Sequence, residues 1–329
     1  MSLHAYALTA PLQDALRPAG IQAVHLGNLW NLTLGLCGLV FAAVLGACLY
    51  ALWRAPRGDA GTAPDLRSLA QPERRVWRAI AWATAASTLG LLGLLAADVW
   101  TSRALARLPL ADAVNIELTG HQWWWEARYL DADPAREFMT ANELHIPVGR
   151  PVLVTLRADD VIHTLWIPNL QGKKDMIPGR TATITLRADR AGSYRGQCAE
   201  FCGVEHALMA LLVEAEPNAA YEAWAARQRE AAPAPRDALA QRGRAVFVNG
   251  NCARCHTVAG TDAQGRMGPD LSHLASRRTI GAGMFPNKRG HLAGWIADPQ
   301  SLKPGVYMPP NALAPDDLQA LLAYLETLK

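Results

Sequence analysis

The sequence of 329 residues has little charge, few cysteines and no internal repeat. Charged residues make up 19% of the chain and its formal net charge is +3. These values exclude a disordered polyelectrolyte and give no reason to expect nucleic-acid binding. Six cysteines are too few for a disulfide scaffold, and no compositional bias indicates a collagen-like or low-complexity chain. Half of the residues are hydrophobic, and the length suggests about two domains.

Two long runs without a charged residue occur in the N-terminal third, at residues 32–53 and 79–97. Each run could cross the roughly 30 Å hydrocarbon core of a bilayer as a helix. A buried core helix is the alternative, but the short charged segment between the runs favours a membrane hairpin. Tryptophans, which are typical of membrane interfaces, stand near the run ends: Trp30, Trp53, Trp77 and Trp100.

The segment that connects the two runs is rich in arginine. Its arginines are Arg54, Arg57, Arg67, Arg74, Arg75 and Arg78. The segment before the first run has only Arg17, so the positive-inside rule predicts a cytoplasmic connecting loop. Both termini are then expected outside, which in a bacterium is the periplasmic side. No cationic start before an apolar core marks a removable signal peptide. Cys37 and Cys48 are interpreted as small apolar residues of the first span.

Beyond residue 108 the pattern changes to short alternating runs. Apolar residues alternate at 114–118, 152–156 and 182–186, with proline and glycine between the runs, and 208–213 is a further apolar run. This spacing predicts a β-sandwich or barrel. A short helix is expected at 221–230 and a proline-containing linker follows it. Two further helices are predicted at 237–248 and 316–328.

Soft metal ligands are concentrated in one stretch of the strand-rich region. Cys198, Cys202, His206 and Met209 supply two thiols, an imidazole and a thioether within twelve residues. His163, placed at the end of a predicted strand, supplies a second imidazole. Thiolate, thioether and imidazole together suit copper. A disulfide and a Cys₂His₂ zinc site are alternatives; zinc would leave the methionine without a role, whereas two copper ions with bridging thiolates would use every donor.

Four stretches resemble subunit II of cytochrome c oxidase: residues 120–125, 163–168, 174–179 and 196–209. With the preceding hairpin, the resemblance covers about residues 20–225. It implies a cupredoxin domain that carries the binuclear CuA centre. The ligands it implies are His163, Cys198, Cys202, His206, Met209 and the backbone carbonyl of Glu200.

The same resemblance implies roles for several neighbours of these ligands. Trp123 would lie on the electron-entry path, whereas Trp124 and Trp125 are equally explained by aromatic packing or a membrane-interface belt. In this family, the side chain of the residue that matches Glu200 can bind Mg²⁺ at the interface with subunit I. Asp160 and Asp175 are expected to have structural or hydrogen-bonding roles there. Glu73 is out of register with the family's proton-channel glutamate and receives no proton role.

The sequence Asn-Cys-Ala-Arg-Cys-His at 251–256 is the attachment pattern of c-type haem. Cys252 and Cys255 would bond to the vinyl groups, and His256 would ligate the iron. A zinc-ribbon fragment is the alternative, but a second cysteine pair is missing. Met308, in a Met-Pro loop before the last predicted helix, fits as the sixth iron ligand.

Met267 and Met284 are rival ligands, and a resemblance of residues 237–329 to class I cytochrome c favours Met308. The stretch Gly-Pro-Asp-Leu at 268–271 matches this family as well. The resemblance further implies that the first and last helices of the segment pack together. The residues expected at that contact are Gly243, Phe247 and Tyr324.

The predicted fold is a two-helix transmembrane hairpin, an all-β cupredoxin-like sandwich or barrel, and a small all-α cytochrome c domain. The predicted boundaries are a periplasmic segment at 1–28, the hairpin at 29–100 with spans at about 30–53 and 77–99, the CuA domain at 101–225, a linker at 226–236 and the cytochrome c domain at 237–329. Residues 101–231 hold 14 basic and 17 acidic residues, net −3, and residues 232–329 hold 11 and 7, net +4. Opposite charges predict that these two parts dock together.

Together these features predict the electron-entry subunit of a haem-copper terminal oxidase in the bacterial inner membrane. Electrons would pass from cytochrome c or a quinol-oxidising complex to haem c, then to CuA and on to subunit I. As the resemblance implies, that partner reduces oxygen to water and pumps protons, and subunit III is a further expected partner. No catalytic residue is assigned to this chain.

Two other functions remain open at this point. The nearer one is the CuA-bearing subunit of a nitric oxide reductase, which this chain alone separates poorly from an oxidase subunit. The second is a copper-handling or assembly protein, which has no evident need for a fused haem domain. A quinol oxidase subunit II is disfavoured because that branch has lost the copper ligands.

Overall fold

The computed structural model describes residues 11–55, 58, 61, 63, 73–107 and 109–329. The chain divides into two compact units, one of residues 25–107 and one of residues up to 24 together with 108–329. Arg57 and Arg67, which the positive-inside argument used, lie outside the described residues.

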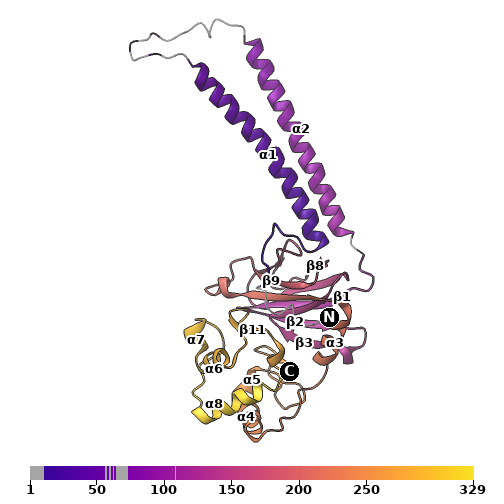
Figure 1. Ribbon diagram of the computed structural model, residues 1–329, viewed down its shortest axis with the longest axis vertical. Helices are drawn as coiled ribbons and strands as arrows, with labels where there is room; N and C mark the ends of the chain where they lie inside the picture. The colour runs from indigo at the N-terminus through magenta and orange to yellow at the C-terminus, as the bar shows by residue number, and fades with distance from the viewer. Residues whose placement is uncertain (1–10, 56–57, 59–60, 62, 64–72, 108) are drawn as a thin grey trace. The chain divides into compact units, whose positions relative to one another are not determined.

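Two long helices make up the first unit, α1 (Ile21–Arg54) and α2 (Arg74–Ala106) (Figure 1). Both are long and apolar enough to cross a membrane, and their most apolar windows are unburied. Leucine, valine, phenylalanine and tryptophan side chains along both helices are exposed. An apolar surface of this kind needs an apolar surrounding, which agrees with the predicted hairpin.

The segment before α1 and the first turn of that helix pack on the strand-rich domain. Leu12 forms a parallel bridge with Tyr194, and its backbone bonds with Ser193 and Arg195. The buried Gln22 side chain donates to the carbonyl of Thr185. These contacts begin α1 at Ile21, well before the uncharged run, because its first turn already has a protein surface to pack against.

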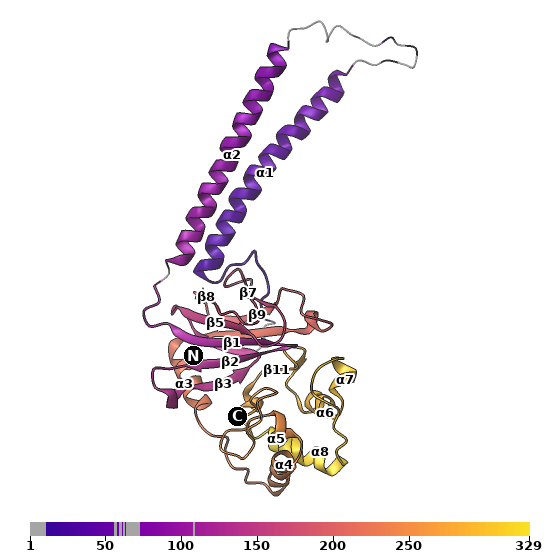
Figure 2. The same ribbon diagram turned by 180° about the vertical axis from the view of Figure 1, so that it is seen from behind.

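The strand-rich domain is a sandwich of two five-stranded sheets (Figures 1 and 2). One sheet has the order β3-β2-β1-β5-β8: β1 (Val114–His121), β2 (Trp124–Leu130), β3 (Phe138–Ala141), β5 (Val152–Ala158) and β8 (Ala182–Leu186). The other has the order β4-β10-β9-β6-β7: β4 (Glu143–Pro147), β6 (His163–Trp166), β7 (Lys173–Met176), β9 (Gly192–Cys198) and β10 (Ala210–Glu216). β1 pairs in parallel with β5, and β10 with β4, while the other neighbours are antiparallel.

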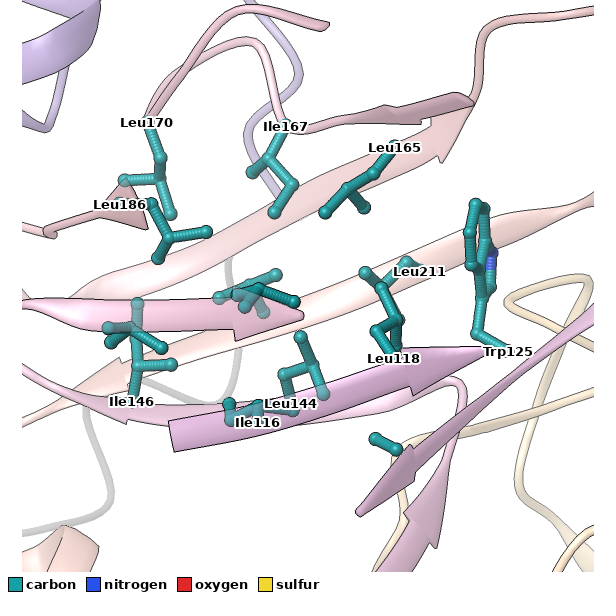
Figure 3. Close-up of a cluster of buried hydrophobic side chains, with 14 of the residues drawn as sticks. Ile116, Leu118, Trp125, Leu144, Ile146, Leu165, Ile167, Leu170, Leu186 and Leu211 are labelled. Atoms are coloured by element: carbon teal, nitrogen blue, oxygen red, sulfur yellow. The ribbon is translucent and has the colours of Figure 1, made fainter. Parts of the chain in front are cut away.

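The core of the sandwich lies between these sheets, as Figure 3 shows. Ile116 and Leu118 of β1 face Leu144 of β4 and Leu211 of β10, and all are at most 1% exposed. Trp125 closes this core and is fully buried. Burial of each such side chain contributes roughly 1.5–3 kcal/mol. The core therefore fixes the two sheets against each other.

The prediction that His163 lies at the end of a strand is wrong. His163 does not end a strand but begins β6, because β5 ends at Ala158 and the chain crosses to the opposite sheet over residues 159–162. A two-residue alternation cannot show such a crossing, since both strands carry the same pattern.

The C-terminal segment is helical, with a short pair of strands, β11 (Thr279–Ile280) and β12 (Phe285–Pro286). Its helices are α4 (Ala238–Asn249), α5 (Cys252–Cys255), α6 (Arg289–Ala297), α7 (Pro299–Leu302) and α8 (Pro315–Leu325), and α3 (Asn218–Gln228) precedes them on the sandwich side of the linker. The expected packing of the first helix on the last is confirmed: the Phe247 and Tyr324 rings meet edge to face at 5.9 Å. Gly243 of α4 lies directly against the backbone of α8 at Ala320.

A largely buried histidine, with 13% of its side chain exposed, links two acidic side chains at the edge of the sandwich. The His145 ring nitrogens lie 3.1 Å from Glu143 and 3.1 Å from Glu216, and the ring stacks on Trp224 at 4.2 Å. Burial disfavours the charged imidazole, but the two carboxylates outweigh it and raise the pKa of His145 to about 9.

We expect this histidine to make the stability of the sandwich depend on pH. A raised pKa in the folded state means that the stabilisation is fully present below pH 6.5 and disappears as the pH rises through about 9. Its size is up to about 3 kcal/mol. Urea unfolding of the detergent-solubilised chain, followed by tryptophan fluorescence, should show this loss. His145→Gln should flatten the profile, whereas a variant at the exposed His291 should leave it unchanged; equal profiles for wild type and His145→Gln would contradict the assignment.

Candidate copper and haem centres

The sheet that contains β6, β9 and β10 brings the predicted copper ligands together. β6 and β9 pair so that Leu165 lies opposite Cys198, which places His163 next to the end of β9. The loop after β9 then carries Cys202 and His206 and returns to Met209 just before β10. The Cys198 amide donates to the carbonyl of Met209 at 2.9 Å, which closes the loop at its base.

All six predicted donors meet in this loop. The Cys198 sulfur lies 3.8 Å from His163 Nδ1, 3.2 Å from the carbonyl oxygen of Glu200 and 3.7 Å from the Cys202 sulfur. The Cys202 sulfur lies 3.6 Å from His206 Nδ1 and 3.9 Å from Met209 Sδ. The structure thus gathers donors that are up to 46 residues apart in the sequence.

Burial and hydrogen bonding prepare these side chains for metal binding. His163 and Met209 are fully buried, and the two cysteines are at most 3% exposed. The contact between the two sulfurs lowers the pKa of Cys198 and raises that of Cys202, so the pair readily holds one negative charge. A thiolate is the form that binds soft metals.

Asp160 and Gly120 hold His163 in place. Asp160 lies 2.8 Å from Nε2 of the imidazole, which leaves Nδ1 free to face Cys198. Although burial acts in the opposite direction, bonds from His163 and from the Val161 and Gln122 amides keep the pKa of Asp160 below its usual value. A Cβ at Gly120 would lie 2.9 Å from the His163 ring, so only glycine leaves space for it. Asp175 accepts a bond from Thr164 at 2.7 Å, which agrees with its expected structural role.

The donor set fits a pair of copper ions better than the alternatives. Both cysteines are free and their sulfurs are 3.7 Å apart, so the structure contains no disulfide here. A four-ligand zinc site would not use the buried thioether or the carbonyl of Glu200. Two thiolates between two imidazoles, with a thioether and a carbonyl, provide the soft, rigid site that copper electron transfer requires.

The Trp123 side chain lies beside the candidate copper site. The indole is 6% exposed, and its Nε1 donates to the carbonyl of Cys202 at 3.0 Å. Trp124 instead stacks on His121 at 4.4 Å, and Trp125 belongs to the sandwich core. Only Trp123 of the three therefore reaches a predicted copper ligand directly through a hydrogen bond.

A cavity of about 780 Å³ lies between the helical segment and the sandwich. Its walls include the predicted haem residues Cys252, Cys255, His256 and Met308. The opposite wall is formed by the sandwich, with Trp123 among its residues. The volume is in the range of ligand-binding cavities, and its lining is mainly apolar.

The side chains around the cavity fit a haem. His256 Nδ1 lies 2.8 Å from the carbonyl of Pro269, so its Nε2 is left for an iron atom. Burial lowers the pKa of His256 and favours the neutral, ligating form. The buried Arg277 guanidinium lines the cavity, and its Nε has no partner among the described residues, as expected beside an anionic group such as a haem propionate.

Of the three methionines considered as the second iron ligand, the structure favours Met308. Met308 is half-buried in the cavity wall, and its carbonyl accepts a bond from Gln300 at 2.9 Å. Met267 also lines the cavity but is 76% exposed, and Met284 is not among the lining residues. Met308 is therefore the candidate whose position is fixed by its own loop.

The helical segment and the sandwich are in direct contact, as their opposite charges predict. Arg278 forms an ion pair with Glu214 at 2.6 Å, and its amide donates to Glu143 at 2.9 Å. The amide of Ala210 donates to the carbonyl of Ala282 at 3.1 Å. Most of these contacts involve backbone groups, so charge complementarity supplies only part of the attachment.

Sequence reasoning missed the residues that make this contact. Lys303 is 1% exposed and donates to carbonyls of both parts, and burial lowers its pKa to about 8. Arg277 and His145 were missed as well. No sequence signal marks them, because burial of a charged side chain follows from which segments meet in the fold.

Comparisons with known proteins agree with both sites. Residues 130–216 match the family model described as cytochrome c oxidase subunit II, periplasmic domain, and residues 240–329 match the cytochrome c model. The copper-binding loop lies inside the first match, and the haem motif and Met308 lie inside the second. A cupredoxin-like sandwich followed by a helical cytochrome c domain is thereby established, and with it a copper and a haem c site.

Several relatives can be compared over most of the chain. A protein of Alkalihalophilus pseudofirmus named cytochrome c oxidase subunit 2 is 40% identical over 219 residues, which cover 66% of this chain and 62% of the relative. One of Bacillus sp. strain PS3 with the same name is 34% identical over 230 residues, 66% of this chain and 63% of the relative. The chain thus spans about three fifths of the length of these relatives.

Among solved structures, the periplasmic domain of subunit II of cytochrome oxidase of Bradyrhizobium japonicum is 28% identical. It covers 35% of this chain and 93% of that domain, with a TM-score of 0.34. Together with the two apolar helices, the family-model match of residues 130–216 to a periplasmic oxidase domain indicates a membrane-anchored subunit with periplasmic domains.

Proposed function

We propose that this chain is the electron-entry subunit of a haem-copper terminal oxidase, a member of the cytochrome c oxidase subunit II family with a cytochrome c domain at its C-terminus, because residues 130–216 and 240–329 match the models of these two families. Haem c and the copper pair would each supply reversible one-electron redox chemistry. The chain would bind and orient both groups. The reduction of oxygen would take place on a partner subunit.

One observation carries this proposal: a single cavity has the haem-binding residues on one wall and Trp123 on the other. Trp123 in turn donates to the backbone of Cys202. The two candidate redox sites are therefore joined through one buried indole. A copper-handling protein has no use for such a junction, whereas an electron conduit depends on it.

We assign six residues to the copper pair and four to the haem. The copper ligands are His163, Cys198, Cys202, His206, Met209 and the backbone carbonyl of Glu200. The haem would be held by Cys252 and Cys255, with His256 and Met308 as iron ligands. The side chain of Glu200 is exposed, and we assign it to Mg²⁺ at the interface with subunit I.

We place the chain in the bacterial inner membrane as a two-span protein with both termini in the periplasm. The hydrogen bonds between Leu12 and the sandwich support this topology, because they require the segment before α1 to lie on the same side as the copper domain. Subunit I, subunit III and a donor, either cytochrome c or a quinol-oxidising complex, complete the proposed assembly. Proton pumping would belong to subunit I.

Gas consumption tests this function directly. The detergent-solubilised complex, purified through this chain, is supplied with a reduced mediator, and uptake of oxygen and of nitric oxide is recorded in parallel. We expect fast oxygen uptake that cyanide abolishes. Nitric oxide consumption with negligible oxygen uptake would instead assign the chain to a nitric oxide reductase, and no uptake of either gas would favour a copper-handling role.

A further inference from the structure

Lys303 is a fully buried lysine at the contact between the cytochrome c domain and the copper domain. It follows α7 and precedes Met308 by five residues, and only 1% of it is exposed. An ammonium group removed from water is unfavourable unless hydrogen bonds replace its hydration. Apolar packing alone therefore does not explain why a lysine is buried here.

The Lys303 ammonium group is satisfied by three backbone carbonyls. Its Nζ donates to Trp123 at 2.9 Å, to Leu208 at 2.8 Å and to Gly281 at 3.2 Å. These bonds use all three of its donors. The first two acceptors belong to the copper domain and the third to the cytochrome c domain, so one side chain joins three segments from two domains.

The acceptors stand beside the residues assigned to electron transfer. Trp123 is the indole that bonds to the backbone of Cys202, and Leu208 immediately precedes the copper ligand Met209. On the other side, Lys303 lies at the base of the loop that ends in Met308. The ammonium therefore fixes this loop relative to the copper site.

Neighbouring contacts of the same loop support this arrangement. A Cβ at Gly305 would lie 3.4 Å from the Trp123 ring, so this loop backbone packs against the indole. The Tyr307 hydroxyl donates to the Gln122 side chain at 3.2 Å, but Tyr307 is 70% exposed. Of the residues in this contact, Lys303 has the buried polar side chain. We therefore expect its replacement to weaken the contact most.

We propose that Lys303 is a positioning residue for electron transfer between the two domains: it holds the Met308 loop against Trp123 and so keeps the haem docked to the copper site. This inference rests on the proposed function. The step would transfer one electron from the haem to the copper pair, and no bond would form or break in it. Without Lys303, the cytochrome c domain would have to find its docked position before each transfer.

A role limited to the fold of the cytochrome c domain does not explain these contacts. Only Gly281 among the three acceptors lies in that domain. Its helices pack through an apolar cluster that includes Phe247 and Leu321. The domain can therefore keep its fold and its haem when Lys303 is replaced, while its attachment to the copper domain weakens.

The test is Lys303→Met in the complete detergent-solubilised complex. This change keeps an unbranched apolar stem but leaves the carbonyls of Trp123 and Leu208 without their donor. After flash reduction of the haem, we expect transfer to the copper pair to slow by about tenfold or more, since the docked position loses the hydrogen bonds of a charged group. The matched control is Lys288→Met, an exposed lysine of the same domain, which should transfer at the wild-type rate.

Two further readouts separate positioning from damage to either site. The haem and copper absorption and paramagnetic resonance spectra should match wild type in Lys303→Met. The transfer rate should become dependent on solvent viscosity, because the domain must now search, and hydrogen exchange at residues 299–308 should accelerate. Lys303→Arg, which retains charge and donors, should restore part of the rate.

The possible outcomes are distinct. Transfer in Lys303→Met at the wild-type rate without viscosity dependence would overturn the proposal for Lys303 alone. If Lys303→Met does not accumulate, Lys303→Gln is measured in its place; altered metal spectra in either variant would show that Lys303 builds a site rather than positions it. Absence of transfer in the wild-type complex would instead refute the proposed function itself.

Discussion

Replacement of Cys198 by Ser should remove the copper pair and stop oxygen uptake by the complex. The Cys198 sulfur lies within 3.8 Å of His163, the carbonyl of Glu200 and the Cys202 sulfur, so it is the shared centre of the donor set. A serine hydroxyl is a hard, neutral donor that suits copper poorly. Loss of an outer hydrogen-bond partner already lowers metal affinity by about 10- to 100-fold, and loss of this ligand should exceed that range.

The measurement is copper content per chain together with haem reduction and oxygen uptake. In Cys198→Ser we expect the haem still to accept electrons, while oxygen uptake falls to background. Cys37→Ser is the matched control, because Cys37 is exposed on α1 and is not one of the six predicted donors. Normal copper content and oxygen uptake in Cys198→Ser would show that the copper lies elsewhere.

The second large effect is expected at Gly243, where α4 crosses α8. A Cβ at this position would lie 1.9 Å from the carbonyl oxygen of Ala320 and 2.8 Å from Tyr324 Cβ. Because the closest atom is backbone, the helices must separate rather than a side chain move aside. In an exposed helix the change from glycine to alanine would stabilise by about 1 kcal/mol; here we expect Gly243→Ala to destabilise by about 3 kcal/mol or more.

Thermal unfolding of the cytochrome c domain in the full chain, followed by haem absorbance, checks this value. Gly290→Ala in α6 is the matched control, since a Cβ there meets nothing within 4 Å and the backbone is helical. Stability of Gly243→Ala equal to that of Gly290→Ala would mean that the two helices do not cross as closely as described. A loss confined to Gly243→Ala would establish the crossing as the structural basis of the haem cavity.

The two predictions test different parts of the proposed electron path. Cys198 acts at the copper pair itself, whereas Gly243 acts on the packing that shapes the haem cavity through Phe247 and its neighbours. Lys303 stands between them, since it affects neither site but their mutual position. Comparison of the three variants therefore separates loss of a redox centre, loss of a domain and loss of docking.

Much of both sites could be predicted because their residues are close in the sequence. The haem attachment residues fall within five positions, and five of the six predicted copper donors fall within twelve. Local spacing of this kind restricts the geometry whatever the rest of the fold does. The two membrane helices could be predicted equally well, since a long run of apolar residues indicates an apolar surrounding.

Other features depended on the tertiary structure. The sequence could not show that the chain crosses between sheets before His163, because alternation is the same in both sheets. Nor could it show that Gly120 makes space for that histidine, or that two carboxylates enclose His145. Each of these facts concerns residues brought together from distant parts of the chain.

By itself, then, the sequence determined most of the donors that each centre can use, because ligand chemistry belongs to side chains and their local spacing. Only the tertiary structure decided how the two centres are joined. Trp123, Leu208 and Lys303 are separated by up to 180 residues and meet around one ammonium group. Their meeting follows from the burial of one domain surface on another, and that burial alone turns an ordinary lysine into part of the contact.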